Sequence, residues 1–234
     1  MSVLSDPQRF RKLVAGAALI GFPVAGLASC LTDSAEGTGQ SGSELAKYVS
    51  DNASGIHTSG LIFMLSAVLT VPAALGVAHL LRHRGSTLGH IGAACLIIGA
   101  FGHFAYGFWQ VLISQAQGLD VVTYLGRMSS QSNLLLPEMI LVDVGVLLLS
   151  IGLVRSRAVP SWAPWTTIVG IGLDVIVQFS GTTATWPVTA IWGLLVVTWG
   201  YIGVRVLRME RAAWASFDLA AVPAPQVREM ADLA

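Results

Sequence analysis

Three ionisable side chains lie deep inside long apolar stretches of this sequence. They are His103, Asp143 and Asp174, and each belongs to a different stretch. Ionisable groups at membrane depth face protein or water rather than lipid, and by default they mark proton or ion pathways. Counted at about 1.5 Å per residue from the outer end of each stretch, the three lie roughly 9 to 15 Å deep. The spacing predicts that they share the middle-to-outer part of a membrane.

Helical spacing also predicts which way two of these residues face. His103 and Asp174 each fall in a row of residues four apart that contains small side chains. Such rows are where membrane helices approach each other closely, so we expect both residues to face protein. The two rows are Cys95, Gly99, His103 and Gly107, and Thr166, Gly170, Asp174 and Gln178.

Further polar residues lie nearer the outer ends of the same stretches, with the last of them at the rim. One interpretation is a polar pocket, or a proton or ion path, that opens to the outer side and pairs His103 with Asp143 or Asp174. The alternative is a structural cluster in which protonated or hydrogen-bonded acids hold three helices in register. The further residues are Glu138, Tyr106, Gln178 and His57.

A second group of histidines lies near the end of another apolar stretch. His79 and His83 are four residues apart, a spacing that suits metal ligation on one helix face, and a short turn could bring His90 close. The alternative is a set of interfacial histidines among anchoring arginines, because no carboxylate lies nearby in the sequence to complete a site.

Missing motifs exclude several enzyme classes. The sequence has five histidines in total and contains no HExxH, Walker A or GxSxG motif, the signatures of zinc proteases, phosphate-binding loops and serine hydrolases. We therefore expect no cofactor and a non-catalytic role. An intramembrane enzyme or redox protein that uses His103, Asp143 and Asp174 stays open, as does a structural or regulatory membrane subunit.

The elements that must position these residues are six apolar segments. Charged residues make up only 11% of the chain, against roughly a quarter in soluble domains, and a spanning helix needs about 20 apolar residues. Backbone groups in lipid must be satisfied within the segment. We predict an all-α bundle of six transmembrane helices over 1–208 and a cytoplasmic tail over 209–234. The predicted spans are 13–30, 56–81, 88–113, 134–154, 162–180 and 187–207.

Basic residues predict the orientation. Eleven of the 13 Lys and Arg residues fall on the side of the two termini, which the positive-inside rule makes cytoplasmic. The excess of Arg over Lys, with abundant Ala and Gly, suggests a bacterium with GC-rich codons, so we expect a multi-pass protein of the bacterial plasma membrane. The expected partner is the lipid bilayer rather than nucleic acid. A small solute or ion, a second copy of the chain and a membrane partner protein stay open.

Two local patterns concern the first outer loop. Leu27-Ala28-Ser29-Cys30 fits a lipobox, which would make Cys30 a lipidated, cleaved terminus; the alternative is a helix end that happens to be rich in small residues. Further on, Ser41 and Glu44 form a capping box that predicts a short amphipathic helix on the outer surface.

Two stretches carry a resemblance to known proteins. SELAKYVSDNASGI enters the second span, and RSRAVPSWAPW leads a basic inner turn into the fifth. With six spans, these features resemble a broad group of uncharacterised six-span integral membrane proteins of bacteria. The resemblance extends over nearly the whole chain and implies the fold and the membrane location. It supplies no catalytic residues.

Overall fold

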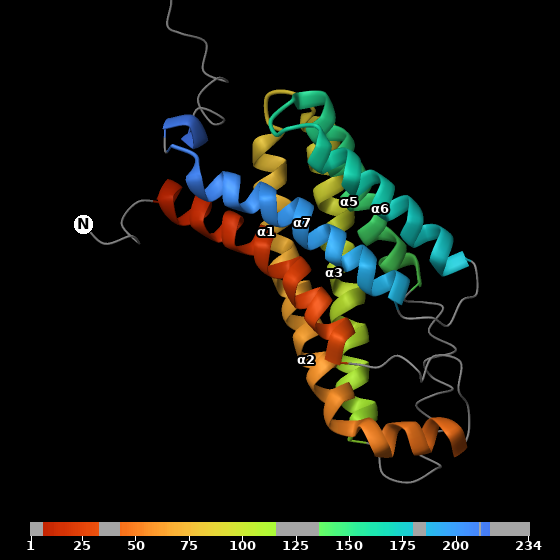
Figure 1. Ribbon diagram of the computed structural model, residues 1–234. Coiled ribbons are helices and arrows are strands. Elements are labelled where there is room, and N and C mark those ends of the chain that lie inside the picture. Colours follow the sequence, from red (N-terminus) through yellow and green to blue (C-terminus); the bar gives the residue numbers. More distant parts are fainter. Residues whose placement is uncertain (1–6, 33–42, 116–135, 180–185, 211, 216–234) are drawn as a thin grey trace, which may run out of the picture.

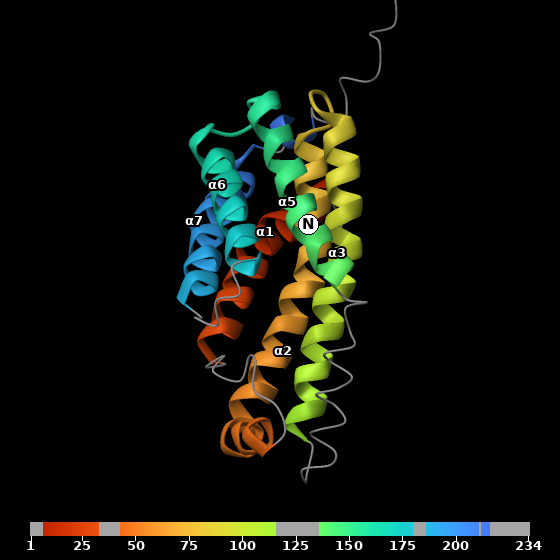
Figure 2. The same cartoon turned by 90° about the vertical axis from the view of Figure 1, so that its right-hand side faces the viewer.

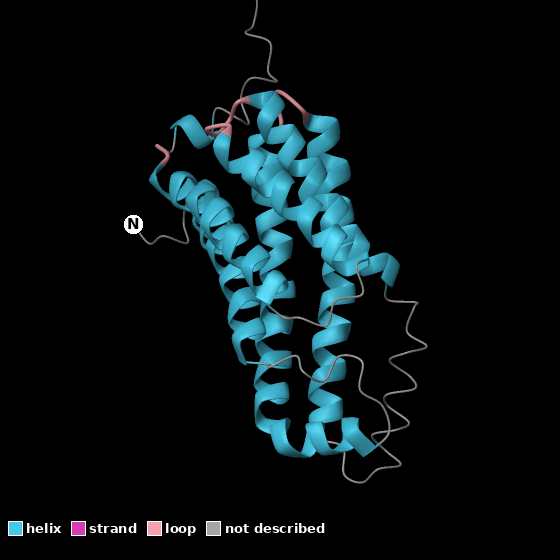
Figure 3. Cartoon of the chain, turned by 45° about the vertical axis from the view of Figure 1, so that its right-hand side comes forward, coloured by secondary structure: helices cyan, strands magenta, loops and turns pink. Residues whose placement is uncertain are grey.

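The computed structural model describes residues 7–32, 43–115, 136–179, 186–210 and 212–215. Within these ranges the regular structure is entirely helical (Figure 3), so the predicted all-α fold class is confirmed. The principal helices are α1 (Pro7–Thr32), α2 (Ser43–Leu80), α3 (Ser86–Ser114), α5 (Leu136–Ser156), α6 (Trp162–Phe179) and α7 (Trp186–Arg208).

Among the described residues, four helices contain segments that are long and apolar enough to cross a membrane. These segments are Pro7–Thr32, Ala46–Leu80, Ser86–Ser114 and Trp186–Arg208, whereas the apolar part of α6, Trp162–Val177, is shorter. Length and composition therefore support an all-α membrane protein. The total of six spans stays a prediction.

The six helices form a closed ring. Each helix packs against the next one along the chain, and α7 closes the ring against α1 (Figure 1). Leu19, Val77, Leu96, Leu149 and Trp199 come from five different helices, and the structure leaves each of them 0% exposed. Burial of this kind is typical of a close-packed core. The shared core holds the five helices in fixed positions relative to one another.

Glycines set three of the helix contacts. A methyl group on Gly60 would lie 2.6 Å from the backbone oxygen of Gly107, and one on Gly203 would lie 2.7 Å from that of Gly16. Such spacing lets membrane helices approach until their backbones touch. The pairs are Gly16 and Gly203 between α1 and α7, Gly60 and Gly107 between α2 and α3, and Gly92 and Gly145 between α3 and α5.

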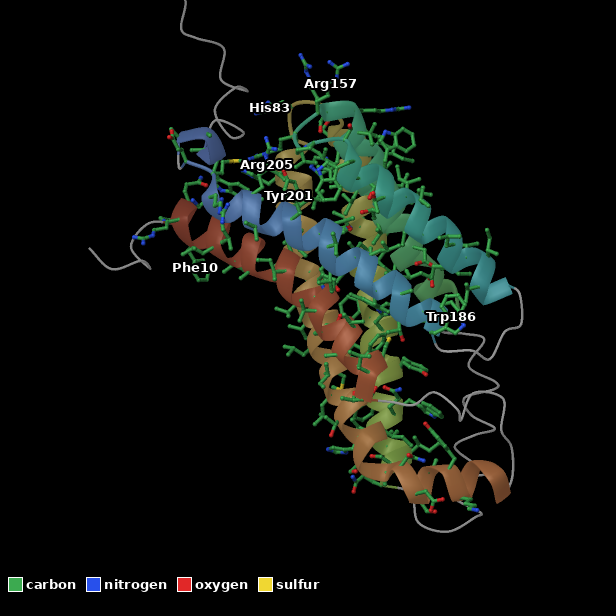
Figure 4. The ribbon with its side chains drawn as sticks, viewed as in Figure 1. Phe10, His83, Arg157, Trp186, Tyr201 and Arg205 are labelled. Atoms are coloured by element: carbon green, nitrogen blue, oxygen red, sulfur yellow. The ribbon has the colours of Figure 1, made fainter. Side chains whose placement is uncertain are left out.

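The start of α1 and the end of α7 lie at the same end of the bundle (Figure 1). The Lys12 ammonium group joins these two regions by donating a hydrogen bond of 2.7 Å to the backbone oxygen of Met209. His83, Arg157 and Arg205 also lie at this end (Figure 4). We call it the inner end, and the opposite one the outer end.

The outer halves of α2 and α3 project beyond the other helices (Figure 2). A tight turn joins α2 to α3 at the inner end and uses Gly85 at φ 95°, a left-handed conformation that favours glycine. Along α3, Gly145 of α5 lies against Leu96, since a methyl group on Gly145 would be 2.6 Å from the Leu96 nitrogen. From this register, α3 continues about 14 Å past the start of α5 at 1.5 Å per residue.

The expected amphipathic surface helix is the beginning of α2 rather than a separate element. Its first turns run across the direction of the rest of the helix (Figure 1). Val49 and Ile56 are 2% and 4% exposed and pack with Ile113 of α3. This apolar contact holds the bent segment against the outer end of α3. Ser54-Gly55 lies within the segment, and Gly/Ser pairs are sites at which helices bend.

The chain after α7 folds back onto the bundle. Residues 212–215 form a short helical turn. Trp214 is 2% exposed, and its ring stacks on that of His79 with centroids 4.2 Å apart. The start of the predicted tail therefore belongs to the packed inner end. Residues 216–234 lie outside the described part.

Candidate functional site

His103 lies in the ring interior among aromatic side chains from other helices. It is 9% exposed, and its ring centroid lies 4.8 Å from that of Phe63 on α2. The Trp192 ring on α7 lies 6.5 Å away. Because α3 and α7 are not adjacent in the ring, the contact with Trp192 reaches across its interior.

Phe63 connects the members of this group. Its ring meets those of Tyr106 and Trp192 edge to face, with centroid distances of 5.8 and 6.4 Å. We call Phe63, His103, Tyr106 and Trp192 the aromatic cluster. Edge-to-face pairs contribute about 0.5 to 1.5 kcal/mol each beyond the burial of their surface, so the rings hold one another in place.

Trp192 is seated against the backbone of α1. A methyl group on Gly26 would lie 2.1 Å from the Trp192 Cζ3 atom, so any larger residue at position 26 would displace the indole. The side chain of Trp192 is only partly buried. Gly26 thus positions a large aromatic face that other side chains do not fully cover.

The hydrogen-bonding capacity of His103 is unused within the described part of the chain. No hydrogen bond joins either ring nitrogen to another described residue. A neutral imidazole offers one donor and one acceptor, and neither His103 nitrogen is among the fully buried polar atoms that lack a partner in the described part of the chain. A polar ligand that reached His103 would find a donor and an acceptor there.

Asp174 lies on the face of α6 that turns towards the ring interior. Thr167 and Ile171 on this face are 1% and 4% exposed, whereas Val169 and Ile176 on the opposite face are 58% and 65% exposed. Asp174 itself is partly exposed. Its helix presents the aspartate on the protein side, as the row of small residues predicts.

The register of α6 and α7 places Asp174 at the depth of the aromatic cluster. Thr167 donates a hydrogen bond of 3.1 Å to Thr198 across these antiparallel helices. Asp174 lies seven residues further outward from Thr167, and Ile191 lies seven residues outward from Thr198. Both are therefore about 10 Å outward from the threonine pair, and Asp174 lies level with Trp192.

Asp143 lies deeper than the sequence predicts. It is two residues outward from Gly145, whose neighbour on α3 is Leu96, while His103 is seven residues outward from Leu96. The difference of five residues places Asp143 about 8 Å closer to the inner end than His103. Equal depth was expected because each depth was counted from the outer end of its own span, but α3 extends past α5. The predicted pairing of His103 with Asp143 or Asp174 stays a prediction.

Two other predicted pocket residues cannot be placed. Glu138 and Gln178 belong to α5 and α6, but their side chains lie outside the described part of the structure. Tyr106, by contrast, is a member of the aromatic cluster and lies one helical turn further outward than His103.

His57 lies at the outer end, as predicted, and forms a separate polar contact. Its Nδ1 atom is 3.2 Å from the Ser114 hydroxyl and 3.2 Å from the Gln115 amide nitrogen. The Ser114 hydroxyl donates its proton to the backbone oxygen of Val111 at 2.7 Å. A general base would have to accept that proton, so this serine–histidine contact does not have the arrangement of a catalytic pair.

The three inner histidines have other neighbours. The His79 Nε2 atom is 3.1 Å from the backbone oxygen of Trp214, and the His90 Nδ1 atom is 2.7 Å from that of Ser86. His83 is exposed. Among the described residues, no three His, Cys, Asp or Glu side chains are placed to hold a metal ion. The structure gives the proposed His79, His83 and His90 metal site no support.

The sequence did not indicate two members of the aromatic cluster, Phe63 and Trp192. In the sequence, Phe63 and Trp192 cannot be told apart from lipid-facing or interfacial aromatic residues, which are common in membrane helices. Gly26 was the available clue, because a glycine in the middle of an apolar helix often marks a close approach, but the sequence does not say what approaches it.

Comparison with protein-family models, with curated proteins and with solved structures finds no match for this chain.

Proposed function

We propose that the chain crosses a bacterial plasma membrane six times, with both termini in the cytoplasm. The support is the distribution of basic residues, since 11 of 13 fall on the predicted cytoplasmic side. His83, Arg157 and Arg205 lie at the inner end with the start of α1 and the end of α7 (Figure 4). Reporter fusions to each terminus would test this orientation.

We further propose that the protein binds or conducts a small solute or ion in the ring interior, reached from the outer end. One observation carries this proposal. His103 is buried among rings from three helices, without a hydrogen bond to any other described residue, at the depth of Asp174. A purely structural cluster would be expected to satisfy its own polar groups.

Cysteine accessibility tests this function without knowledge of the ligand. Cys30 and Cys95 are first replaced by serine, and the His103→Cys and Phe101→Cys variants are made in that background. Phe101 lies two residues away on α3 but is 69% exposed on the outside of the bundle. Intact cells are then treated with a charged, membrane-impermeant thiosulfonate reagent.

The reagent reacts with the ionised thiol, which forms in water and not in lipid. We expect His103→Cys to be modified from the outside at least tenfold faster than Phe101→Cys. Equal, background-level modification of both variants would show that His103 is sealed within a structural core, and would overturn the proposal.

A further inference from the structure

We propose that the ring interior at the aromatic cluster takes a small organic ammonium ion; this rests on the proposed function and names the ligand class of that site. The first argument is the sign of the charge. The six predicted spans contain three carboxylates but only one Lys or Arg residue, Arg205, which lies at the inner end (Figure 4). Within the predicted spans, an anion would find no cationic partner near Trp192. A cation would find the Asp174 carboxylate at the same depth on the neighbouring helix α6.

The second argument is the chemistry of the surrounding atoms. Calcium and magnesium ions need about six oxygen ligands, and the described residues contain no cluster of three metal-ligating side chains. The cluster instead offers the aromatic rings of Phe63, Tyr106 and Trp192. Aromatic faces attract alkylated ammonium ions through the ring quadrupole, and Trp is the strongest of them.

The third argument is His103. Its ring is buried beside Phe63 and Trp192, and its nitrogens make no hydrogen bond with the described residues. It can therefore meet a hydroxyl group on the ligand. A ligand with an alkylammonium group and a nearby hydroxyl would use all three features: the Trp192 ring, the charge of Asp174 and the imidazole.

The experiment compares two molecules of the same shape. Choline and 3,3-dimethylbutan-1-ol both carry a hydroxyl, but the quaternary nitrogen of choline is a neutral carbon in the alcohol. Each is titrated into the purified full-length protein in detergent, and binding is followed by tryptophan fluorescence and by calorimetry. We expect saturable binding of choline and at least tenfold weaker binding of the alcohol.

Variants locate the binding. Asp174→Asn should weaken choline binding at least tenfold, and Trp192→Phe should weaken it severalfold while keeping an aromatic ring. The matched control is Trp186→Phe on the same helix, because Trp186 is 73% exposed (Figure 4) and should leave binding unchanged. A thermal melt of each variant separates lost binding from lost folding.

The outcomes separate the two proposals. Equal binding of choline and the alcohol, or saturable binding of sodium or phosphate instead of choline, would overturn the ammonium class. No binding of choline, together with rapid modification of the His103→Cys variant, would also overturn the class but keep the accessible site. No binding together with a shielded His103→Cys variant would overturn both.

Discussion

The contact between α2 and α3 gives a sharp test of the fold that supports the site. Gly60 and Gly107 face each other across these helices, three residues from Phe63 and four from His103 respectively. In a Gly60→Ala variant the new methyl group would lie 2.6 Å from the Gly107 oxygen and 3.0 Å from both the Gln110 Cβ and Val111 Cγ2 atoms. Normal carbon contacts are about 3.5 to 4.0 Å, so the helices must move apart by several tenths of an ångström to about 1 Å.

The magnitude follows from two opposing terms. Overpacking a well-packed contact costs about 1 to 3 kcal/mol. Replacing glycine by alanine in a helix returns about 0.8 to 1 kcal/mol of helix propensity. We expect the free energy of unfolding of Gly60→Ala to fall by about 0 to 2 kcal/mol relative to the parent, and by about 1 to 3 kcal/mol relative to a glycine-to-alanine variant that meets no neighbour. The shift should also loosen the contact between Phe63 and His103.

Gly172 and Gly200 provide matched controls, because a methyl group at either position meets nothing within 4 Å. Their alanine variants gain helix propensity without a steric clash. Their free energy of unfolding should equal that of the parent or exceed it slightly. The assay is reversible unfolding in mixed detergent micelles, followed by helical circular dichroism. If Gly60→Ala matched Gly172→Ala in unfolding free energy, the close approach of α2 and α3 would be wrong.

Three further predictions concern other contacts. Trp214→Ala should release the segment that follows α7 while the ring stays folded, and the loss of a buried tryptophan, about 3 kcal/mol or more, should speed hydrogen exchange at residues 212–215 by a factor on the order of one hundred. Gly26→Ala should displace the Trp192 indole, which would shift the tryptophan emission and weaken choline binding at least tenfold. Ser59 and Ser29 share a hydrogen bond of 2.8 Å between their hydroxyls, and a double-mutant cycle of their alanine variants should give a coupling of about 0.6 kcal/mol in unfolding free energy, the average for such bonds in membranes.

The fold class could be predicted from the sequence because lipid imposes few solutions. Long apolar runs with almost no charge must be helices, and the observed helices fall on the predicted runs. The facing of Asp174 was predictable for a similar reason, since the small residues on its row mark a helix contact. These are properties of single helices, which a sequence displays directly.

The arrangement of the site depends on the axial register between neighbouring helices, and this register cannot be read from the sequence. Asp143 was expected level with His103, but the Gly145 contact with Leu96 sets it about 8 Å deeper. The aromatic cluster brings together residues from α2, α3 and α7 across the ring. Nothing in the pattern around Phe63 or Trp192 distinguishes them from aromatic residues that face lipid.

The most direct test of the account is whether choline protects the path to the ring interior. The Tyr106→Cys variant, in the background without Cys30 and Cys95, keeps Asp174, His103, Phe63 and Trp192 in place. Because Tyr106 belongs to the aromatic cluster, calorimetry first establishes that this variant binds choline. Its rate of modification by the impermeant reagent is measured from the outside with and without choline. The account predicts that choline slows the reaction saturably while 3,3-dimethylbutan-1-ol does not; a rate unchanged by saturating choline would contradict it.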